Sequence, residues 1–331
     1  KISVELAGRE KRYAFFKNIM VKEKYDVCAT AHHLDDQAET ILLQLFRGAG
    51  IKGLCAMPVI RKQNSNIEPQ VLRPLLKISR SEIETYAKQY KLSWIEDESN
   101  NSIAYNRNFL RHKILPVLKE KYPNYAKTLL RSSQHLSEAS LLLDELAEMD
   151  SKHSFYAGKL RIEAIQNLSP PRAKNLLRHI FSQQNIRLPS TAKLADILQQ
   201  LLSIRTDSQR KITTGKTVIC CYKGLMYLLP KTKPPLSTWQ LLWNGENHLP
   251  LKDLNGTIIF SYSKGKGINE EKLLQEPVIF RLRQGGERFS PHCNRPRRSL
   301  KNLLQEAAVP PWERKTLPLL FSGEKLVWVP G

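Results

Sequence analysis

The residues best suited to chemistry form one polar string, Thr30-Ala-His-His-Leu-Asp-Asp-Gln-Ala-Glu-Thr40. The string begins at the end of an apolar segment, residues 25–31, which is typical of a strand buried in a parallel sheet. A helical pattern then runs from Gln37 to about Phe46. The string therefore occupies the carboxyl end of a predicted strand, which is where open α/β sheets bind ligands.

Three carboxylates of this string share one predicted helical face, because Glu39 follows Asp36 by three residues and Asp35 by four. An ordinary capped helix start is one interpretation, since the helix dipole favours acids in the first turn. That effect explains one or two acids but not the neighbouring His32 and His33. Oxygen ligands grouped in this way suit Mg²⁺ shared with substrate phosphates, so the pattern favours a functional site.

Two chemistries compete for the polar string. In nucleotidyl transfer, Mg²⁺ bridges ATP phosphates and the carboxylates hold the metal. In a metal-dependent phosphohydrolase, His32, His33, Asp35 and Asp36 would bind a transition metal directly. The hydrolase needs further histidine or aspartate clusters downstream, and the remaining histidines form no metal-like pair. The second chemistry is therefore less favoured.

The elements that must position these residues alternate between helix and strand in the first part of the chain. Helices are predicted over residues 9–20 and 81–90, the second with a capping box formed by Ser79 and Glu82, and a short strand at Trp94-Ile95. This alternation predicts an α/β fold, a doubly wound parallel sheet, as the first domain, residues 1–118.

Two further domains are predicted beyond Pro116. Residues 119–235 are predicted as a helical domain with helices over 124–150, 172–181 and 190–202, followed by strands 217–222 and 227–229 and a linker, 230–235. Residues 236–331 are predicted as a small α+β domain with strands 257–262 and 278–282 and a helix over 299–308.

The charge balance indicates a polyanionic partner. Lys and Arg number 52 against 31 Asp and Glu, which gives a net charge of +21. A basic string, Asn294–Lys301, precedes the last predicted helix and could meet a phosphate backbone or be an ordinary solvated run of charge. Trp312 could stack on a base or act as a buried staple at the helix end.

No apolar run is long enough for a membrane helix, and five cysteines without a CxxC pair favour a reducing cytoplasm.

Several motifs together resemble a known family. The string AHHLDDQAET, followed by LLQLFRGAGIKGLCAMP, resembles the second motif region of the PP-loop ATP pyrophosphatases and is most similar to the tRNA(Ile)-lysidine synthetase family. That family's next signature is matched by Asp97-Glu-Ser-Asn100 and by Arg107-Asn-Phe-Leu-Arg-His112. Residues 280–288 and 300–314 resemble its C-terminal domain.

The resemblance implies a PP-loop/HUP-like fold and a ligase that forms a carbon–nitrogen bond. ATP would adenylate O2 of the wobble cytidine, position 34, of an isoleucine tRNA with a CAU anticodon. Free L-lysine would then attack C2, which releases AMP and gives lysidine. ATP and Mg²⁺ are the expected cofactors, the location is cytoplasmic without a membrane partner, and a homodimer is left open.

The resemblance also assigns roles to individual residues. By match to the family motif, the catalytic residues are Asp36, Glu39, Arg107 and Arg111. The two acids would hold Mg²⁺, and the two arginines would contact phosphate or the activated base unless they are ordinary solvated side chains. The nucleotide-binding residues are His33, Asp35, Arg47, Gly48 and Gly50, although the glycines alone would only mark a helix stop. The tRNA contacts in the basic string are Arg295, Arg297, Arg298 and Lys301.

One departure from the family pattern keeps two alternatives open. The phosphate-binding loop of the superfamily, Ser-Gly-Gly-x-Asp-Ser, does not occur in the sequence. Because backbone N–H groups of that loop bind the pyrophosphate, we expect a fragmentary chain that binds ATP poorly. The alternatives are a related PP-loop tRNA thiolase, which would want cysteine pairs, and a non-catalytic tRNA-binding fragment.

Overall fold

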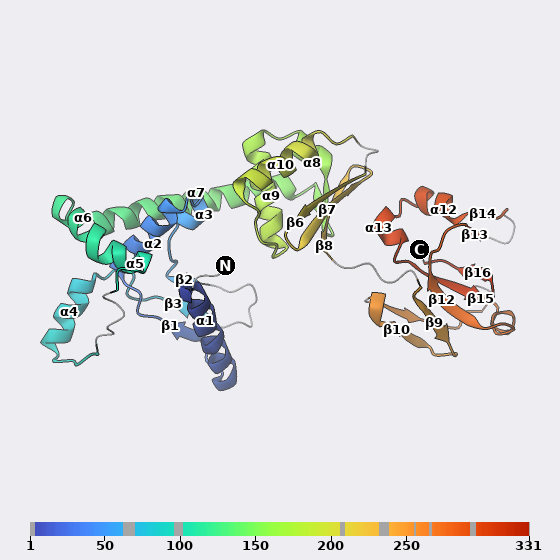
Figure 1. The fold of residues 1–331 in the computed structure, drawn as a ribbon, viewed down its shortest axis with the longest axis horizontal. Helices are drawn as coiled ribbons and strands as arrows, with labels where there is room; N and C mark the ends of the chain where they lie inside the picture. The colour runs from blue at the N-terminus through green and yellow to red at the C-terminus, as the bar shows by residue number, and fades with distance from the viewer. Residues whose placement is uncertain are drawn as a thin grey trace. The chain divides into compact units, whose positions relative to one another are not determined.

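The computed structural model describes the backbone of eight stretches: residues 4–61, 70–95, 102–205, 209–231, 238–254, 256–264, 267–291 and 296–330. The chain divides into two compact units, Lys1–Met149 and Asp150–Gly331 (Figure 1). No helix among the described residues combines the length and apolarity that a membrane crossing requires.

The first unit combines a small sheet with several helices. Its strands are β1 (Val27–Ala29), β2 (Ile60–Arg61) and β3 (Gln70–Leu72). Its helices are α1 (Val4–Glu23), α2 (Leu34–Phe46), α3 (Ile51–Leu54), α4 (Arg80–Gln89), α5 (Asn106–Phe109), the π-helix η2 (Leu110–Ile114), α6 (Leu115–Lys121) and α7 (Tyr125–Ser151), whose last residues enter the second unit.

The sheet of this unit is only partly the predicted one. β1 and β3 pair in parallel, with Cys28 opposite Val71, as expected of a doubly wound fold. β2 pairs with β3 antiparallel, so the observed sheet is mixed, in the order β1-β3-β2. The predicted strand at Trp94-Ile95 is wrong, because these residues have no regular structure and Ile95 is 98% exposed. A strand forms only where a neighbouring strand pairs with it, and composition does not show whether one is present.

Local signals place the helices of the first unit well. Ser79 caps α4: its hydroxyl accepts from the Glu82 N–H at 3.3 Å, and the Glu82 carboxylate accepts from the Ser79 N–H at 2.8 Å, which confirms the capping box. The apolar face of α2 presents Leu34, Ala38 and Leu42 to buried partners on α6, α7 and η2. These contacts fix the helix that carries the polar string.

The first part of the second unit corrects the predicted helical domain. The predicted helices are present as α9 (Pro170–Gln183) and α10 (Thr191–Leu202), together with α8 (Ile162–Gln166). They pack on a five-stranded antiparallel sheet in the order β4-β5-β8-β7-β6, formed by β4 (Phe155–Tyr156), β5 (Lys159–Arg161), β6 (Arg210–Thr214), β7 (Thr217–Tyr222) and β8 (Leu225–Pro230). This part is therefore α+β, because the short strands outside 217–229 gave no clear alternation in the sequence.

The C-terminal part is rich in strands and includes the predicted strand at residues 278–282. Four strands, β9 (Gln240–Trp243), β12 (Val278–Leu282), β15 (Pro318–Ser322) and β16 (Lys325–Trp328), form an antiparallel sheet in the order β16-β15-β12-β9. The smaller elements are β10 (His248–Leu251), η3 (Lys252–Leu254), β11 (Gly256–Ile259), α11 (Glu270–Leu273), β13 (Arg288–Phe289), β14 (Arg298–Ser299), α12 (Leu300–Glu306) and α13 (Pro311–Arg314). Alternate residues of β12 are buried, which places Phe280 in the core of this part.

Candidate functional site

The polar string lies where β1 passes into α2, as the sequence predicts. The Thr30 N–H donates to the Leu72 carbonyl at 2.9 Å, so this residue continues the pairing of β1 with β3. His33 precedes the first turn of α2, and its N–H donates to Asp36 Oδ2 at 3.0 Å. An acid in this position is favoured by the helix dipole and satisfies a backbone donor that the helix leaves unpaired. The carboxylate of Asp36 is thereby held at the start of the helix.

Glu39 is the buried centre of the site. Its side chain has no exposed surface, and both carboxylate oxygens accept hydrogen bonds from arginines. Arg107 Nε lies 2.6 Å from Glu39 Oε2, and Arg111 Nε lies 2.6 Å from Oε1. A terminal nitrogen of Arg111 reaches Oε2 at 3.1 Å. Burial of a charge is tolerated where it is paired and hydrogen-bonded in this way.

Asp36 shares the same two arginines but remains partly exposed. Its Oδ1 lies 3.3 Å from a terminal nitrogen of Arg111 and 3.6 Å from one of Arg107. The same nitrogen of Arg107 donates to the Asp36 carbonyl at 3.3 Å and to Thr40 Oγ1 at 3.4 Å. Burial alone would lower the pKa of Arg111, but its hydrogen bond to Glu39 and the nearby carboxylates raise the pKa above the ordinary value. The Arg111 guanidinium therefore remains charged at all working pH values.

The two arginines come from one short helical stretch. Arg107 belongs to α5 and Arg111 to the π-helix η2, four residues later. That spacing puts both side chains on one face, opposite the acids of α2. A π-helical turn inside an α-helix is rare and frequently marks a functional site. The sequence pattern Arg-Asn-x-x-Arg-His is thus explained by two guanidinium groups that bind one carboxylate.

A cavity of about 200 Å³ opens beside this cluster. Its lining includes the carboxylates of Asp35 and Glu39, the cationic groups of Arg80, Arg111 and Lys119, and the side chains of His33 and Tyr125. Asp35 Oδ2 accepts from the Arg80 N–H at 2.8 Å, and Tyr125 Oη lies 3.5 Å from Asp35 Oδ1. Burial and the nearby Asp35 and Glu39 raise the pKa of Tyr125 to about 12. A cavity with these groups can bind a zwitterionic or phosphate-bearing molecule.

The predicted magnesium ligation fits this geometry only in part. Both Glu39 oxygens accept from guanidinium groups, so Glu39 does not fit the role of a metal ligand in this arrangement. No three His, Cys, Asp or Glu side chains within the described stretches gather in a way that could hold a metal ion. Asp36 has some exposed surface, and its ligation of Mg²⁺ stays a prediction.

The predicted nucleotide-binding residues fall into two groups. His33 and Asp35 lie at the cavity, where His33 Nδ1 is buried and has no hydrogen-bond partner among the described residues, 3.6 Å from Asp35 Oδ2. Arg47, Gly48 and Gly50 lie at the other end of α2. With a rise of about 1.5 Å per helical residue, this end is roughly 16 Å from Asp36 along the helix. Gly48 has φ +66, a left-handed conformation that ends the helix, and this agrees with the simpler interpretation of the glycine. Their contact with nucleotide stays a prediction.

The predicted tRNA contacts lie on the surface of the C-terminal part. Arg297, Arg298 and Lys301 are exposed, around β14 and the start of α12. Arg298 forms a bidentate ion pair with Glu306, with Nη1 at 2.9 Å from Oε2. Arg295 and the motif at residues 97–100 lie outside the described residues.

Trp312 takes the second of its two predicted roles. Its ring packs against Tyr227, with ring centroids 5.0 Å apart, and against Tyr222. It is part of a hydrophobic cluster with buried residues of β7 and β8. The tryptophan is therefore an internal packing residue and is not available to stack on a base.

Sequence reasoning did not find Tyr125, Arg80, Lys119 or Thr40. Tyr125 and Asp35 are separated by 90 residues in the chain. Nothing local distinguishes this tyrosine from other residues that begin a helix. Thr40 belongs to the polar string, and its position one turn after Asp36 is the one signal that could have found it.

Comparison with known proteins finds three domain families along the chain. The model of the PP-loop domain matches residues 1–118, so the first part of the chain is a PP-loop domain with mixed α/β content. The TilS substrate binding domain matches residues 160–227, and the TilS substrate C-terminal domain matches residues 278–331. The chain belongs to the tRNA(Ile)-lysidine synthase family.

The relatives that support this membership match the chain over nearly its whole length. The tRNA(Ile)-lysidine synthase of Nitrosomonas europaea is 47% identical over 99% of this chain and 71% of its own length. The protein of the same name from Coxiella burnetii is 37% identical over 99% of this chain and 72% of its own length. Among solved structures, the U34-tRNA thiolase NcsA from Methanococcus maripaludis is 21% identical and covers 38% of this chain and 41% of its own, with a TM-score of 0.33, which supports no conclusion about this chain.

Proposed function

We propose that this protein is a ligase that forms lysidine on an isoleucine tRNA. ATP adenylates O2 of the wobble cytidine of a tRNA with a CAU anticodon, and free L-lysine then displaces AMP at C2. The single observation that carries the proposal is the cluster of Asp36, Glu39, Arg107 and Arg111 beside a cavity, at the carboxyl end of a parallel strand. The family membership supports the same reaction.

The arginines supply the electrostatic part of the proposed reaction. Arg107 and Arg111 each use Nε and one terminal nitrogen on the acids of α2, and no described residue accepts a hydrogen bond from either Nη1. Attack of the cytidine oxygen on the α-phosphate places negative charge on phosphate oxygens, and departure of AMP does so again. Guanidinium groups that are already fixed stabilise such charge without reorganising during the reaction. Glu39 is a positioning residue in this scheme, because it acts through the arginines.

The other groups of the cavity suit the second substrate. Free lysine carries an α-carboxylate and two amines, and the cavity offers Arg80 and Lys119 together with Asp35. Mg²⁺, where it is bound, neutralises phosphate charge, and Asp36 is the residue that would contact it. The proposed reaction takes place in the cytoplasm, where free lysine and ATP are both present.

The test is incorporation of labelled lysine into an isoleucine tRNA transcript. We expect incorporation that requires ATP and lysine and releases AMP and pyrophosphate together with the lysidine product. A transcript with uridine at the wobble position is the matched control and should accept no lysine. Formation of thiocytidine when a sulfur donor replaces lysine would favour the thiolase alternative. Binding of tRNA without any product would favour the non-catalytic alternative, and either result would contradict the proposal.

A further inference from the structure

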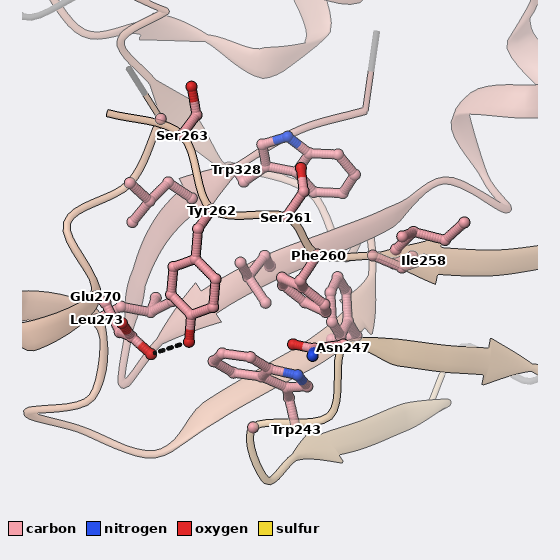
Figure 2. A pocket seen from close by; sticks show the side chains of 16 residues that line it. Trp243, Asn247, Ile258, Phe260, Ser261, Tyr262, Ser263, Glu270, Leu273 and Trp328 are labelled. Atoms are coloured by element: carbon pink, nitrogen blue, oxygen red, sulfur yellow. Dashed lines mark hydrogen bonds between the residues drawn. The ribbon is translucent and has the colours of Figure 1, made fainter. Parts of the chain in front are cut away.

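A second cavity, of about 440 Å³, lies in the C-terminal part. Its lining includes the aromatic residues Trp243, Phe260, Tyr262, Phe280 and Trp328 (Figure 2). The rings of Trp243 and Phe260 are stacked, with centroids 4.5 Å apart and an interplanar angle of 21°. Ligand-binding cavities fall in the size range of roughly 300–1,000 Å³. The size and the lining therefore suit a flat ring system.

The residues around the cavity are held in place by hydrogen bonds and by packing of Trp243, Phe260 and Trp328 against the core. Trp243 Nε1 donates to the Glu246 carbonyl at 2.8 Å, and the Tyr262 hydroxyl donates to Glu270 Oε1 at 3.0 Å (Figure 2). The backbone N–H of Phe260 donates to the Asn247 carbonyl at 2.9 Å. Because the Trp243 N–H and the Tyr262 hydroxyl proton are already donated, a ligand would meet mainly the Tyr262 ring and the face of Trp243 that Phe260 does not cover.

The exposure of Tyr262 is unusual for a ring that is fixed in this way. The residue is 82% exposed, although Glu270 anchors its hydroxyl. Contact of an aromatic ring with solvent does not stabilise the fold, whereas a ring that is fixed at the mouth of a cavity can stack on an aromatic ligand. Asn247, Ser261 and Ser263 add amide and hydroxyl groups, which can donate and accept, and no described residue hydrogen-bonds to their side chains. These groups match the edge of a nucleobase.

The charge of the lining selects the base over the phosphate. Glu270 is the single charged residue among the described lining residues, and it is an acid, so a phosphate group is disfavoured inside the cavity. The surrounding part of the chain, residues 236–331, is basic, with 14 Lys and Arg against nine Asp and Glu. An uncharged ring can therefore enter while its phosphates remain outside in a cationic field.

We propose that this cavity binds one unpaired nucleobase of the bound tRNA, stacked on Trp243 and Tyr262. The inference rests on the proposed function for its RNA ligand, but it assigns a contact that the lysidine reaction itself does not require. A base inside a duplex is paired and stacked and cannot enter. The cavity therefore distinguishes a single-stranded or looped segment of the tRNA from its helical stems.

The test compares the binding of two RNA probes to the full chain by fluorescence anisotropy at one fixed salt concentration. One probe is a short single-stranded RNA of mixed sequence, and the other is a blunt duplex of the same length. Tyr262→Ala should weaken binding of the single strand about tenfold, within the range measured for loss of one stacked base, and leave duplex binding unchanged. Tyr262→Phe keeps the ring and should bind the single strand nearly as well as the native chain.

Leu242→Ala is the matched control. Leu242 is 51% exposed and lies on the strand of Trp243, where adjacent side chains point to opposite faces. It should change neither affinity. A single strand that carries 4-thiouridine should also cross-link to the peptide that contains Trp243 or Tyr262.

Three results would overturn the proposal. If Tyr262→Ala binds the single strand with native affinity, Tyr262 does not stack on a base. Equal loss for both probes would mean a contact with the phosphate backbone, and loss of self-association with unchanged RNA binding would mean that a second copy of the chain occupies the cavity. Lysidine formation is measured separately. If the chain forms lysidine but fails these tests, only the proposed binding of a base in the cavity is rejected. If the chain forms no lysidine but Tyr262→Ala still weakens single-strand binding, only the proposed function is rejected.

Discussion

Arginine residues occur in two very different settings in this protein. Arg107 and Arg111 lie against the fully buried carboxylate of Glu39, with side chains 28% and 23% exposed. Arg297 and Arg298 lie exposed around β14, and among the described residues only Arg298 has an acidic partner. Buried arginines that share a carboxylate have one fixed geometry, which suits a reacting group. Exposed arginines keep mobile side chains and act mainly through their charge, which salt screens.

The comparison predicts that changes in the buried cluster affect chemistry and stability, whereas changes at the exposed arginines affect affinity and its dependence on salt.

Asp36→Asn should have the largest effect on the reaction. The change removes one negative charge beside Arg107 and Arg111 and any ligation of Mg²⁺ by that carboxylate, while the amide oxygen can still accept from the His33 N–H. Pyrophosphate release should fall by about a thousandfold, a loss typical of removing a group that stabilises the transition state. Filter binding of the tRNA should stay within about twofold. Equal loss of binding and of chemistry would contradict the division between the two settings.

Glu39→Gln should destabilise the first unit as well as impair the reaction. The change leaves two largely buried guanidinium groups without their shared carboxylate. Breaking a buried ion pair in this way lowers the free energy of unfolding by about 3 kcal/mol. Urea unfolding measures the loss. Glu84→Gln is the matched control, because Glu84 pairs with Arg80 on the surface at 2.8 Å and should contribute less than about 0.5 kcal/mol. Similar losses in both variants would mean that burial does not distinguish the two pairs.

Arg297→Ala should weaken tRNA binding several-fold and reduce its salt dependence. If this arginine neutralises one phosphate, the slope of log affinity against log salt should fall by about one. Arg298→Ala should have a smaller effect, since the Glu306 carboxylate already compensates its charge. Binding measured at several salt concentrations provides both slopes. An unchanged slope in the double variant would remove these residues from the RNA-binding surface.

Local features of the fold could be predicted from the sequence with good accuracy. The strands at residues 217–222 and 278–282 have the bounds that the apolar patterns indicate. The capping box of Ser79 and Glu82 is likewise confirmed. These features depend on neighbours in the chain, so a single sequence contains the information that determines them.

Features that depend on distant partners could not be predicted in the same way. The antiparallel addition of β2 and the absence of a strand at residues 94–95 follow from which segments pair in the sheet. The acids of α2 were recognised as site residues, but Glu39 lies 68 and 72 positions from its arginine partners. The sequence therefore predicted the acids of the candidate site but not the pairing of Glu39 with two arginines.

Tyr125→Phe should have the smallest effect, confined to alkaline pH. Burial and the nearby Asp35 and Glu39 carboxylates raise the pKa of Tyr125 from 10.0 to about 12 in the folded state. The unfolded chain releases the phenol proton first, so the stability that Tyr125 contributes is fully present below pH 10 and is lost as the pH rises to about 12. The native chain should therefore lose stability relative to Tyr125→Phe over this interval, and the two should change in parallel below it. Urea unfolding at stepped pH measures the difference between the variants, which removes the contribution of the other tyrosines. If the free energies of unfolding of the two chains change in parallel up to pH 12, Tyr125 does not face the acids of the site. The buried group of charges would then consist of Glu39 and its two arginines without Tyr125.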